Sequence, residues 1–294
     1  FEPQPTMAAV QDEQCVSLYG VPTMFIAMLD DPDFDRYDFS SLRTGVMAGS
    51  PCPVEVMKRC VSDMNMEEVT IAYGMTETSP VSTQTLPDDS LAHRTETVGR
   101  VHPHVEIRVA DPETGETLGH DVPGEFCTRG YSVMQGYWND DEKTAEAIDA
   151  DGWMHTGDLA VMAIDGYVNI VGRIKDMIIR GGENIYPREI EEFLYTHPDV
   201  EDVQVIGVPD EKYGEQLMAW VKTRPGSDLG TSQDADAVKE YCKGKIAHYK
   251  IPRYWMVVEE FPMTVTGKTQ KFRIREIAIE KFGLTATTVQ TANV

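Results

Sequence analysis

The chain has 294 residues, of which 41% are hydrophobic and 26% charged, and its formal net charge is −23. This composition is that of a globular protein, and the length suits two or three domains. The acidity argues against a nucleic-acid-binding surface, which needs a basic stripe. No apolar run approaches the about 20 residues of a membrane-spanning helix, so we expect no transmembrane segment.

The cysteines and the first residues bear on the compartment. The five cysteines are scattered and form no CxxC pair, so we expect neither a disulfide framework nor a zinc site, and a reducing cytoplasm as the location. The start of the chain lacks the basic stretch and apolar block of a secretory signal. Because the first residue is Phe1, we expect a segment of a longer protein or a processed product.

Residues 10–85 read as alternating helices and short buried strands. The apolar stretches Leu42–Ala48 and Val69–Tyr73 each end in a turn rich in Gly, Ser or Thr, which is typical of strands in an α/β sheet. From about residue 90 to 172 the pattern changes to alternating strands that Gly and Pro punctuate often. This stretch predicts a small antiparallel β unit.

The last third of the chain predicts a separate α+β domain. Pro187 suits the first position of a helix whose apolar stripe includes Ile190 and Leu194. Strand-like segments VEDVQVIGV and LMAWVKTR follow, then a helix near 236–246, the strand YWMVV, a turn at Thr266–Gly267 and a final helix near 274–282. The closing residues TATTVQTANV predict a frayed tail.

The predicted fold class is therefore α/β plus α+β, with a truncated α/β domain and a mobile α+β domain. We divide the chain as follows: 1–90, the C-terminal portion of a large α/β domain; 91–172, its small β subdomain; 173–176, a hinge; 177–283, the mobile domain; and 284–294, the tail.

The stretch Tyr73–Pro80, YGMTETSP, has the residue types that a nucleotide site needs. An aromatic ring can stack on a base, Gly74 permits close approach of backbone, Thr76 can donate to a phosphate and Glu77 can hold Mg²⁺. A polar turn after a strand would look the same, so this stretch alone leaves both interpretations open.

Several further motifs accompany it in a fixed order. They are AGSP at residues 48–51, GEFCTRGYSVMQGYW at 124–138, HTGD at 155–158, GRIKD at 172–176 and PMTVTGK at 262–268. Together with YGMTE they resemble the adenylate-forming superfamily of acyl-CoA synthetases, peptide-synthetase adenylation domains and luciferases. Within it, the segments YGVPTMF, VMAGSPCP and KDMIIRGGENIYPREIE are most similar to medium-chain fatty acyl-CoA synthetases.

The resemblance implies an ATP-dependent acid–thiol ligase that converts a fatty acid, ATP and coenzyme A to acyl-CoA, AMP and pyrophosphate through an acyl-adenylate. It implies Mg²⁺ as cofactor and a small carboxylic acid, medium-chain in this branch, as substrate. It places Gly49, Ser50 and Pro51 against adenine. The sequence leaves a homo-oligomer open.

The resemblance also assigns roles to residues of the other motifs. Tyr73, Gly74 and Met75 belong to the ATP- or AMP-binding segment. Asp158 resembles the carboxylate that accepts both ribose hydroxyls, and a turn or capping aspartate is its alternative. Arg173 resembles an arginine that reaches the ribose or a phosphate, with a surface salt bridge as the alternative.

Two of the C-terminal motifs have implied roles outside the chemistry at the phosphate. Lys175 resembles the hinge residue about which the last domain turns, although a solvated loop lysine would look the same. The segment Gly181-Gly182-Glu183 resembles the strand end that lines the coenzyme A tunnel, with a plain β-turn as the alternative.

Lys268, together with Thr76 and Glu77, is the implied catalytic set. Attack of a carboxylate on the α-phosphate brings two anions together, and an ammonium group there would stabilise the transition state by about 3–4 kcal/mol. A lysine after a tight Thr-Gly turn is the alternative.

Other candidates are weaker. His102 and His104 have metal-like spacing but no third ligand, and we interpret His155 as a packing or polar loop residue. Cys52 lies between two prolines with no adjacent base.

The chain departs from the family in one respect: it has no Gly/Ser/Thr-rich phosphate loop of the form TSGTTGxPK. Such a loop binds the β- and γ-phosphates through backbone N–H groups. We therefore expect a fragment that lacks this loop and is inactive alone. Two other functions stay open: an adenylation enzyme that loads a carrier protein, and a non-catalytic nucleotide-binding remnant.

Overall fold

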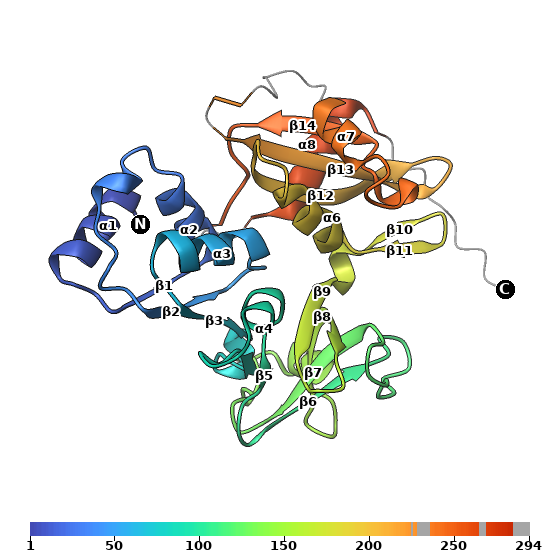
Figure 1. The fold of residues 1–294 in the computed structure, drawn as a ribbon. Coiled ribbons are helices and arrows are strands. Elements are labelled where there is room, and N and C mark those ends of the chain that lie inside the picture. The colour runs from blue at the N-terminus through green and yellow to red at the C-terminus, as the bar shows by residue number, and fades with distance from the viewer. Residues whose placement is uncertain (225, 228–235, 265–268, 285–294) are drawn as a thin grey trace. The chain divides into compact units, whose positions relative to one another are not determined.

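The computed structural model describes residues 1–224, 226–227, 236–264 and 269–284. The chain forms two compact units, Phe1–Ile174 (the first unit) and Lys175–Val294 (the second unit), each with its own sheets and core (Figure 1).

The first unit begins with a five-stranded sheet in the order β1-β2-β3-β4-β5. The first three strands are parallel, and the last two are antiparallel to their neighbours. The strands are β1 (Ser17–Gly20), β2 (Thr44–Ala48), β3 (Glu68–Tyr73), β4 (Thr83–Gln84) and β5 (Arg100–Val101). The sequence segments 42–48 and 69–73 thus form strands as predicted.

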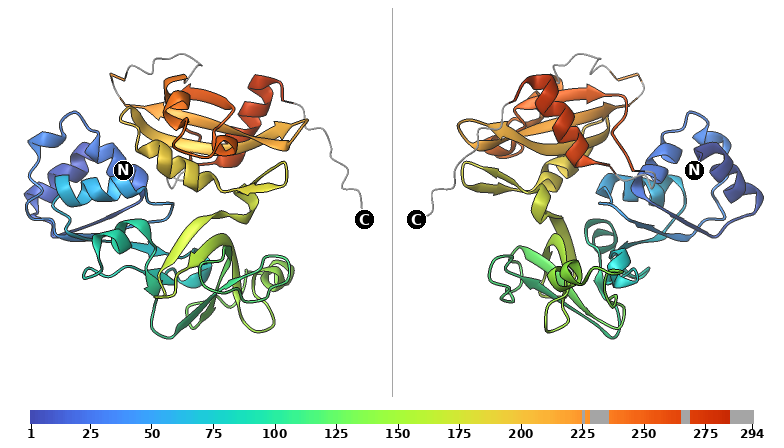
Figure 2. Two further views of the ribbon diagram at one scale, coloured as in Figure 1. Left: turned by 45° about the vertical axis from the view of Figure 1, so that its right-hand side comes forward. Right: turned by 180° about the vertical axis from the view of Figure 1, so that it is seen from behind.

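The helices α1 (Pro3–Asp12), α2 (Pro22–Leu29) and α3 (Val54–Asp63) lie together on one side of this sheet (Figures 1 and 2). Each of α1 and α2 begins at a proline, whose missing N–H would have no partner in a first turn. The buried faces of α1, α2 and α3 contribute Met7, Phe25 and Met57, respectively, to the core. A short helix, α4 (Leu91–Glu96), follows the sheet and is capped by the side chain of Ser90.

A second, four-stranded antiparallel sheet completes the first unit, in the order β6-β7-β8-β9. Its elements are β6 (Val105–Ala110), β7 (Gly124–Gly130), α5 (Asp141–Ala147), β8 (Met154–Met162) and β9 (Val168–Arg173). The predicted β unit is therefore present, and strand β5 pairs with the first sheet. Phe126, Ala160 and Val168 of this sheet belong to the same apolar core as Met47 and Ile71 of the first.

The second unit contains one five-stranded sheet, in which β11-β10-β13-β12 are neighbours and β14 also pairs with β13. Its elements are β10 (Ile178–Arg180), β11 (Glu183–Ile185), α6 (Pro187–Tyr195), β12 (Val200–Asp210), β13 (Gly214–Thr223), α7 (Asp236–Cys242), β14 (Tyr254–Val258) and α8 (Lys271–Phe282). Pro187 opens α6, and Ile190 and Leu194 are buried, as the sequence predicts.

The two faces of this sheet carry separate apolar clusters because successive side chains of a strand point to opposite sides. Val203, Val205 and Leu217 pack with residues of α6 and α7 on one face. Ile206, Val208, Met218 and Trp220 pack with Ile274 and Ala278 of α8 on the other. Figure 2 shows α8 lying across the sheet. The strands β12 and β13 are apolar on both sides, since helices cover both faces.

Two of the sequence predictions for this unit lie outside the described residues: the turn at Thr266–Gly267 and the tail. The final helix is longer than predicted and begins at Lys271.

Candidate functional site

The carboxyl ends of β2 and β3 lie side by side, since Ala48 pairs with Ala72 in a parallel register. Two predicted segments follow at this edge: Gly49–Pro51 after β2, and Gly74–Glu77 after β3. Ligands of open α/β sheets bind outside the carboxyl ends of parallel strands. The fold thus brings together two motifs that are separate in the sequence.

The turn after β3 is tightly built. A Cβ on Gly74 would lie 1.9 Å from the carbonyl oxygen of Pro80, so only glycine fits. The sequence interpretation assigned this glycine to close approach of a ligand; in the structure its own chain makes the close approach. The hydroxyl of Thr78, which is buried, accepts a hydrogen bond from Met75 N at 3.1 Å. Thr76 is exposed and Glu77 half-buried in the short 3-10 helix Thr76–Thr78.

Asp158 connects two other predicted residues. The hydroxyl of Tyr73 donates a hydrogen bond to Asp158 Oδ2 at 2.7 Å, and Arg173 Nε lies 3.2 Å from Asp158 Oδ1. Asp158 and Arg173 are also register partners on the adjacent strands β8 and β9. Three residues that were predicted from three motifs therefore meet at one carboxylate. Tyr73 is the last residue of β3, so this group of three side chains lies beside the carboxyl end of that strand.

Tyr73 is fixed by more than this hydrogen bond. Its ring packs edge-on against Phe126 of β7, with 5.0 Å between the centroids. Burial and, after it, the negative charge of Asp158 raise the pKa of the Tyr73 phenol far above its ordinary value. Tyr73 therefore stays protonated and acts as a donor to Asp158. Neither the contact with Phe126 nor the bond to Asp158 was predicted from the sequence.

Glu125 of β7 supports the turn that precedes Asp158. Its Oε1 accepts a hydrogen bond from Gly157 N at 3.0 Å, and its Oε2 lies 2.8 Å from His155 Nδ1. Thr156 adds a hydrogen bond from its hydroxyl to Phe126 O at 2.7 Å. The buried carboxylate thus fixes the backbone on which Asp158 is presented. His155, interpreted from sequence as a packing or polar loop residue, is a hydrogen-bonded member of β8.

Glu125, Cys127 and His155 also form a group with metal-ligand atoms within 4.8 Å of one another. Burial, and then the charge of Glu125, raise the pKa of the Cys127 thiol to about 12, so no thiolate is present at neutral pH. Both oxygens of Glu125 already have hydrogen-bond partners. We therefore interpret Glu125 and His155 as residues that support the turn before Asp158.

Glu77 is held by the segment that precedes α5. Its backbone oxygen accepts a hydrogen bond from Met134 N at 2.8 Å, and its Oε1 accepts one from the hydroxyl of Tyr137 at 2.9 Å. Within the described ranges no basic side chain pairs with Glu77, and its Oε2 makes no hydrogen bond there. A carboxylate with one free oxygen and an uncompensated charge suits Mg²⁺, which prefers such ligands.

The remaining predicted residues belong to the second unit. Lys175 is its first residue, directly after the division at Ile174, and it is exposed. Gly181 and Gly182 form the turn of the β10–β11 hairpin, and Glu183 begins β11. Lys268 lies outside the described residues.

Tyr137, Glu125 and Phe126 are contacts of the site that sequence reasoning did not single out. All three lie in the stretch GEFCTRGYSVMQGYW, which was quoted for its family pattern only. The sequence did offer one signal: a carboxylate, Glu125, and a phenol, Tyr137, lie inside a motif that had already been recognised.

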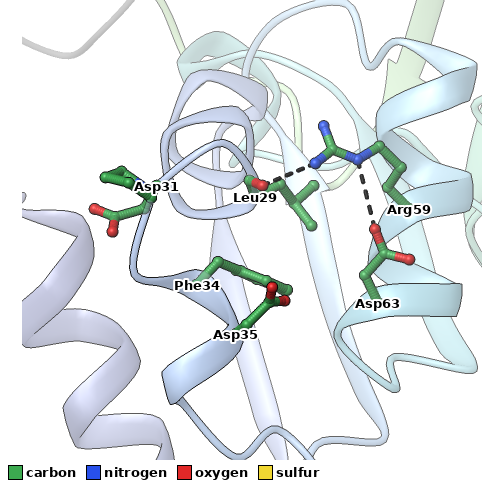
Figure 3. A pocket seen from close by; sticks show the side chains of 7 residues that line it. Leu29, Asp31, Phe34, Asp35, Arg59 and Asp63 are labelled. Carbon is green, nitrogen blue, oxygen red and sulfur yellow. Dashed lines mark hydrogen bonds and ion pairs between the residues drawn. The ribbon is translucent and has the colours of Figure 1, made fainter. Parts of the chain in front are cut away.

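A hollow elsewhere in the first unit contains none of the predicted residues. It lies between α2 and α3 and is lined by Leu29, Asp31, Phe34, Asp35, Arg59 and neighbouring residues (Figure 3). Arg59 closes one side, donating a hydrogen bond to Leu29 O at 2.8 Å and lying 3.5 Å from Asp63 Oδ2. Its acidic lining does not suit a polyanion such as ATP.

The AMP-binding enzyme family matches residues 1–138, and the AMP-binding enzyme C-terminal domain matches residues 189–268. A protein of Bacillus subtilis named "Putative acyl-CoA synthetase YngI" is 56% identical over 97% of this chain and 51% of its own length. The medium-chain acyl-CoA ligase ACSF2, mitochondrial, of Bos taurus is 49% identical over 94% of this chain and 44% of its own.

Among solved structures, the anthranilate CoA ligase AuaEII in complex with anthranoyl-AMP aligns with a TM-score of 0.87 and 28% identity. The alignment covers 96% of this chain and 53% of that structure. This chain spans about half the length of the curated relatives it matches. Of the helices in the described ranges, none has the length and apolar character that crossing a membrane requires.

Proposed function

The chain belongs to the AMP-binding enzymes, and from this premise we propose that it is part of an ATP-dependent acyl-CoA synthetase. The observation that carries the proposal is the junction of Tyr73 and Arg173 at Asp158, beside the carboxyl edge of β2 and β3. The names of the relatives support the reaction class, since they are an acyl-CoA synthetase and an acyl-CoA ligase.

Asp158 is proposed to hold the ribose. An ionised carboxylate has about four lone-pair positions. Tyr73 and Arg173 each occupy one position. The remaining ones can accept hydrogen bonds from the two neighbouring ribose hydroxyls. The adenine would lie against Gly49–Pro51, which follows β2, and against the segment Tyr73–Met75 at the end of β3.

The first half-reaction forms an acyl-adenylate. A carboxylate oxygen of the acid attacks the α-phosphorus of ATP, the bond to the bridging oxygen breaks, and pyrophosphate leaves. We propose that Thr76 donates to a phosphate oxygen and that Lys268 stabilises the charge that builds on the phosphorus. Mg²⁺, held in part by Glu77, would neutralise phosphate charge when bound.

The second half-reaction forms the thioester. The sulfur of coenzyme A attacks the acyl carbonyl, the thiol gives up its proton, and AMP leaves with the bonding electron pair. We propose that the pantetheine arm of coenzyme A lies beside Gly181–Glu183, at the turn of the β10–β11 hairpin. Lys175 is proposed to be the hinge at which the second unit turns after the first half-reaction.

The substrate is proposed to be a medium-chain fatty acid, as the name of the bovine relative suggests. The cytoplasm is the proposed compartment, and the free state of all five cysteines is consistent with it. Light scattering of the purified protein would test the open proposal of a homo-oligomer.

The test uses the enzyme that carries this chain. It is incubated with ATP, Mg²⁺ and octanoate, first alone, then with coenzyme A, then with a phosphopantetheinylated carrier protein. We expect octanoyl-AMP in the first case and octanoyl-CoA in the second, identified by mass spectrometry. A thioester that forms only on the carrier protein would show that the carrier protein, and not coenzyme A, is the acceptor. The absence of any AMP-containing product would contradict adenylation altogether.

A further inference from the structure

Tyr137 contacts the residue that is proposed to hold the metal. Its hydroxyl donates a hydrogen bond to Glu77 Oε1 at 2.9 Å, although the two residues are 60 positions apart in the sequence. The backbone of the same segment contributes a second bond, from Met134 N to Glu77 O at 2.8 Å. Glu77 is therefore fixed at both its side chain and its backbone by the segment that leads into α5.

Tyr137 is itself held in place by α5. Its backbone N–H donates to the hydroxyl of Thr144 at 2.9 Å, and that hydroxyl donates to Asp140 O at 2.8 Å. The preceding Gly136 packs so closely on Thr144 that a Cβ there would lie 2.9 Å from Thr144 Cγ2. The backbone that carries the phenol thus has little freedom to move away from Glu77.

A phenol is a suitable partner for a metal-binding carboxylate because it carries no charge. A lysine or arginine in its place would fix Glu77 equally well but would cancel its charge and compete with a cation. In the described part of the chain Glu77 has no such ion pair.

We propose that Tyr137 is a positioning residue that orients the Glu77 carboxylate for Mg²⁺ without neutralising it. The inference rests on the proposed function, since it takes Glu77 to be a ligand of the metal that accompanies ATP. In this role Tyr137 raises the affinity of the site for the metal.

The experiment compares Tyr137→Phe with the unsubstituted enzyme. The substitution removes one hydroxyl and leaves the ring. Thermal unfolding is recorded with a methylene analogue of ATP that cannot react, while Mg²⁺ is titrated. Since one hydrogen bond to a charged, partly exposed group is lost, we expect the half-effective Mg²⁺ concentration to rise about 3- to 10-fold. The rate of octanoyl-AMP formation should show the same shift and recover at saturating Mg²⁺.

Two further variants make the comparison specific. Tyr131→Phe is the matched control, since Tyr131 lies in the same segment, is 78% exposed and makes no side-chain hydrogen bond in the described part of the chain. We expect it to leave the Mg²⁺ titration unchanged. In a Glu77→Gln background, Tyr137→Phe should produce no additional shift, because the two residues act through the same carboxylate.

Three results would overturn the inference: an unchanged Mg²⁺ titration in Tyr137→Phe, an equal loss of rate at every Mg²⁺ concentration, or fully additive effects with Glu77→Gln. If the unsubstituted enzyme shows no Mg²⁺-dependent response, the proposed function fails and the inference fails with it. A normal response in the unsubstituted enzyme and in Tyr137→Phe alike would remove the inference and leave the proposed function intact.

Discussion

The hydroxyl of Tyr73 lies 2.7 Å from Asp158 Oδ2 and joins the two sheets of the first unit. Tyr73 ends β3 of the first sheet, whereas Asp158 lies in β8 of the antiparallel sheet. The phenol is largely buried and remains protonated, so the carboxylate receives a donor that is fixed before any nucleotide binds. The position of the proposed ribose-binding group thus depends on how the two sheets pack.

Tyr73→Phe should weaken nucleotide binding. The substitution keeps the contact with Phe126 and removes the donor, so Asp158 loses one of its two fixed partners. A hydrogen bond to a charged group contributes about 1.5–3 kcal/mol, which corresponds to roughly a 10- to 100-fold rise in the Kd of AMP. Calorimetry with the complete enzyme measures it. The control is Tyr19→Phe, at an exposed position of β1; an AMP affinity that is the same in both variants would contradict the role of the hydroxyl.

Glu125→Ala should destabilise the first unit. It leaves the N–H of Gly157 and the Nδ1 of His155, both part-buried, without their carboxylate partner, at a cost of about 1–3 kcal/mol in the free energy of unfolding. Glu125→Gln retains an acceptor oxygen for Gly157 and should cost less. Urea unfolding followed by tryptophan fluorescence measures the difference.

The matched control for Glu125 is Glu106→Ala, which breaks an exposed pair with Arg129. Exposed pairs contribute at most about 1 kcal/mol. Equal destabilisation by Glu106→Ala and Glu125→Ala would show that the hydrogen bonds of Glu125 to Gly157 and His155 contribute no more than an exposed ion pair.

Lys268→Ala should separate the two half-reactions. If the ammonium stabilises the charge on the phosphorus, the rate of acyl-AMP formation should fall by about 10²–10³. Conversion of supplied acyl-AMP to acyl-CoA should be nearly unaffected. Quenched-flow assays of each half-reaction measure this, with the exposed Lys243→Ala as control. Losses of similar size in both half-reactions would refute the assignment.

The raised pKa of Asp202 predicts that the stability of the second unit depends on pH. Burial raises its pKa to about 6, and hydrogen bonds from Tyr195 and Val203 oppose this effect. The unfolded chain would release this proton near pH 3.9, so between about pH 4 and 6 the folded state binds more protons and stability falls as pH rises. Above pH 6 the loss from this group is complete and amounts to at most about 3 kcal/mol.

Asp202→Asn removes this titration and keeps an acceptor oxygen. Relative to the unsubstituted protein, we expect it to gain stability as the pH rises from about 4 to 6 and to keep that gain at pH 7. Hydrogen exchange of the β12 amides, measured at several pH values, reports on this unit alone. A difference between the two proteins that is constant across this range would contradict the titration of Asp202.

The sequence predicted strands and helices well where hydrophobic periodicity was strong. The segments that became β2, β3, β12, β13 and β14 are short apolar runs between turn residues, and α6 begins at a proline with an apolar stripe. The start of one helix differs from the prediction: α8 begins three residues before the predicted Ile274. That first turn includes Lys271, whose ammonium pairs with Glu191 at 2.6 Å, a tertiary contact that no local pattern contains.

The sequence alone determined the family and identified the residues at the edge of the first sheet. It could do so because each motif is a short continuous segment, and the order and spacing of such segments are visible in the sequence. Only the tertiary structure decided which side chains act on one another. Tyr73 meets Asp158, Tyr137 meets Glu77 and Glu125 meets Gly157 across 85, 60 and 32 positions of the chain. The first pair depends on the packing of the two sheets, the second on the path of the segment before α5, and the third on the register of β7 and β8. None of these is a local property of the sequence, because each depends on how distant parts of the chain pack.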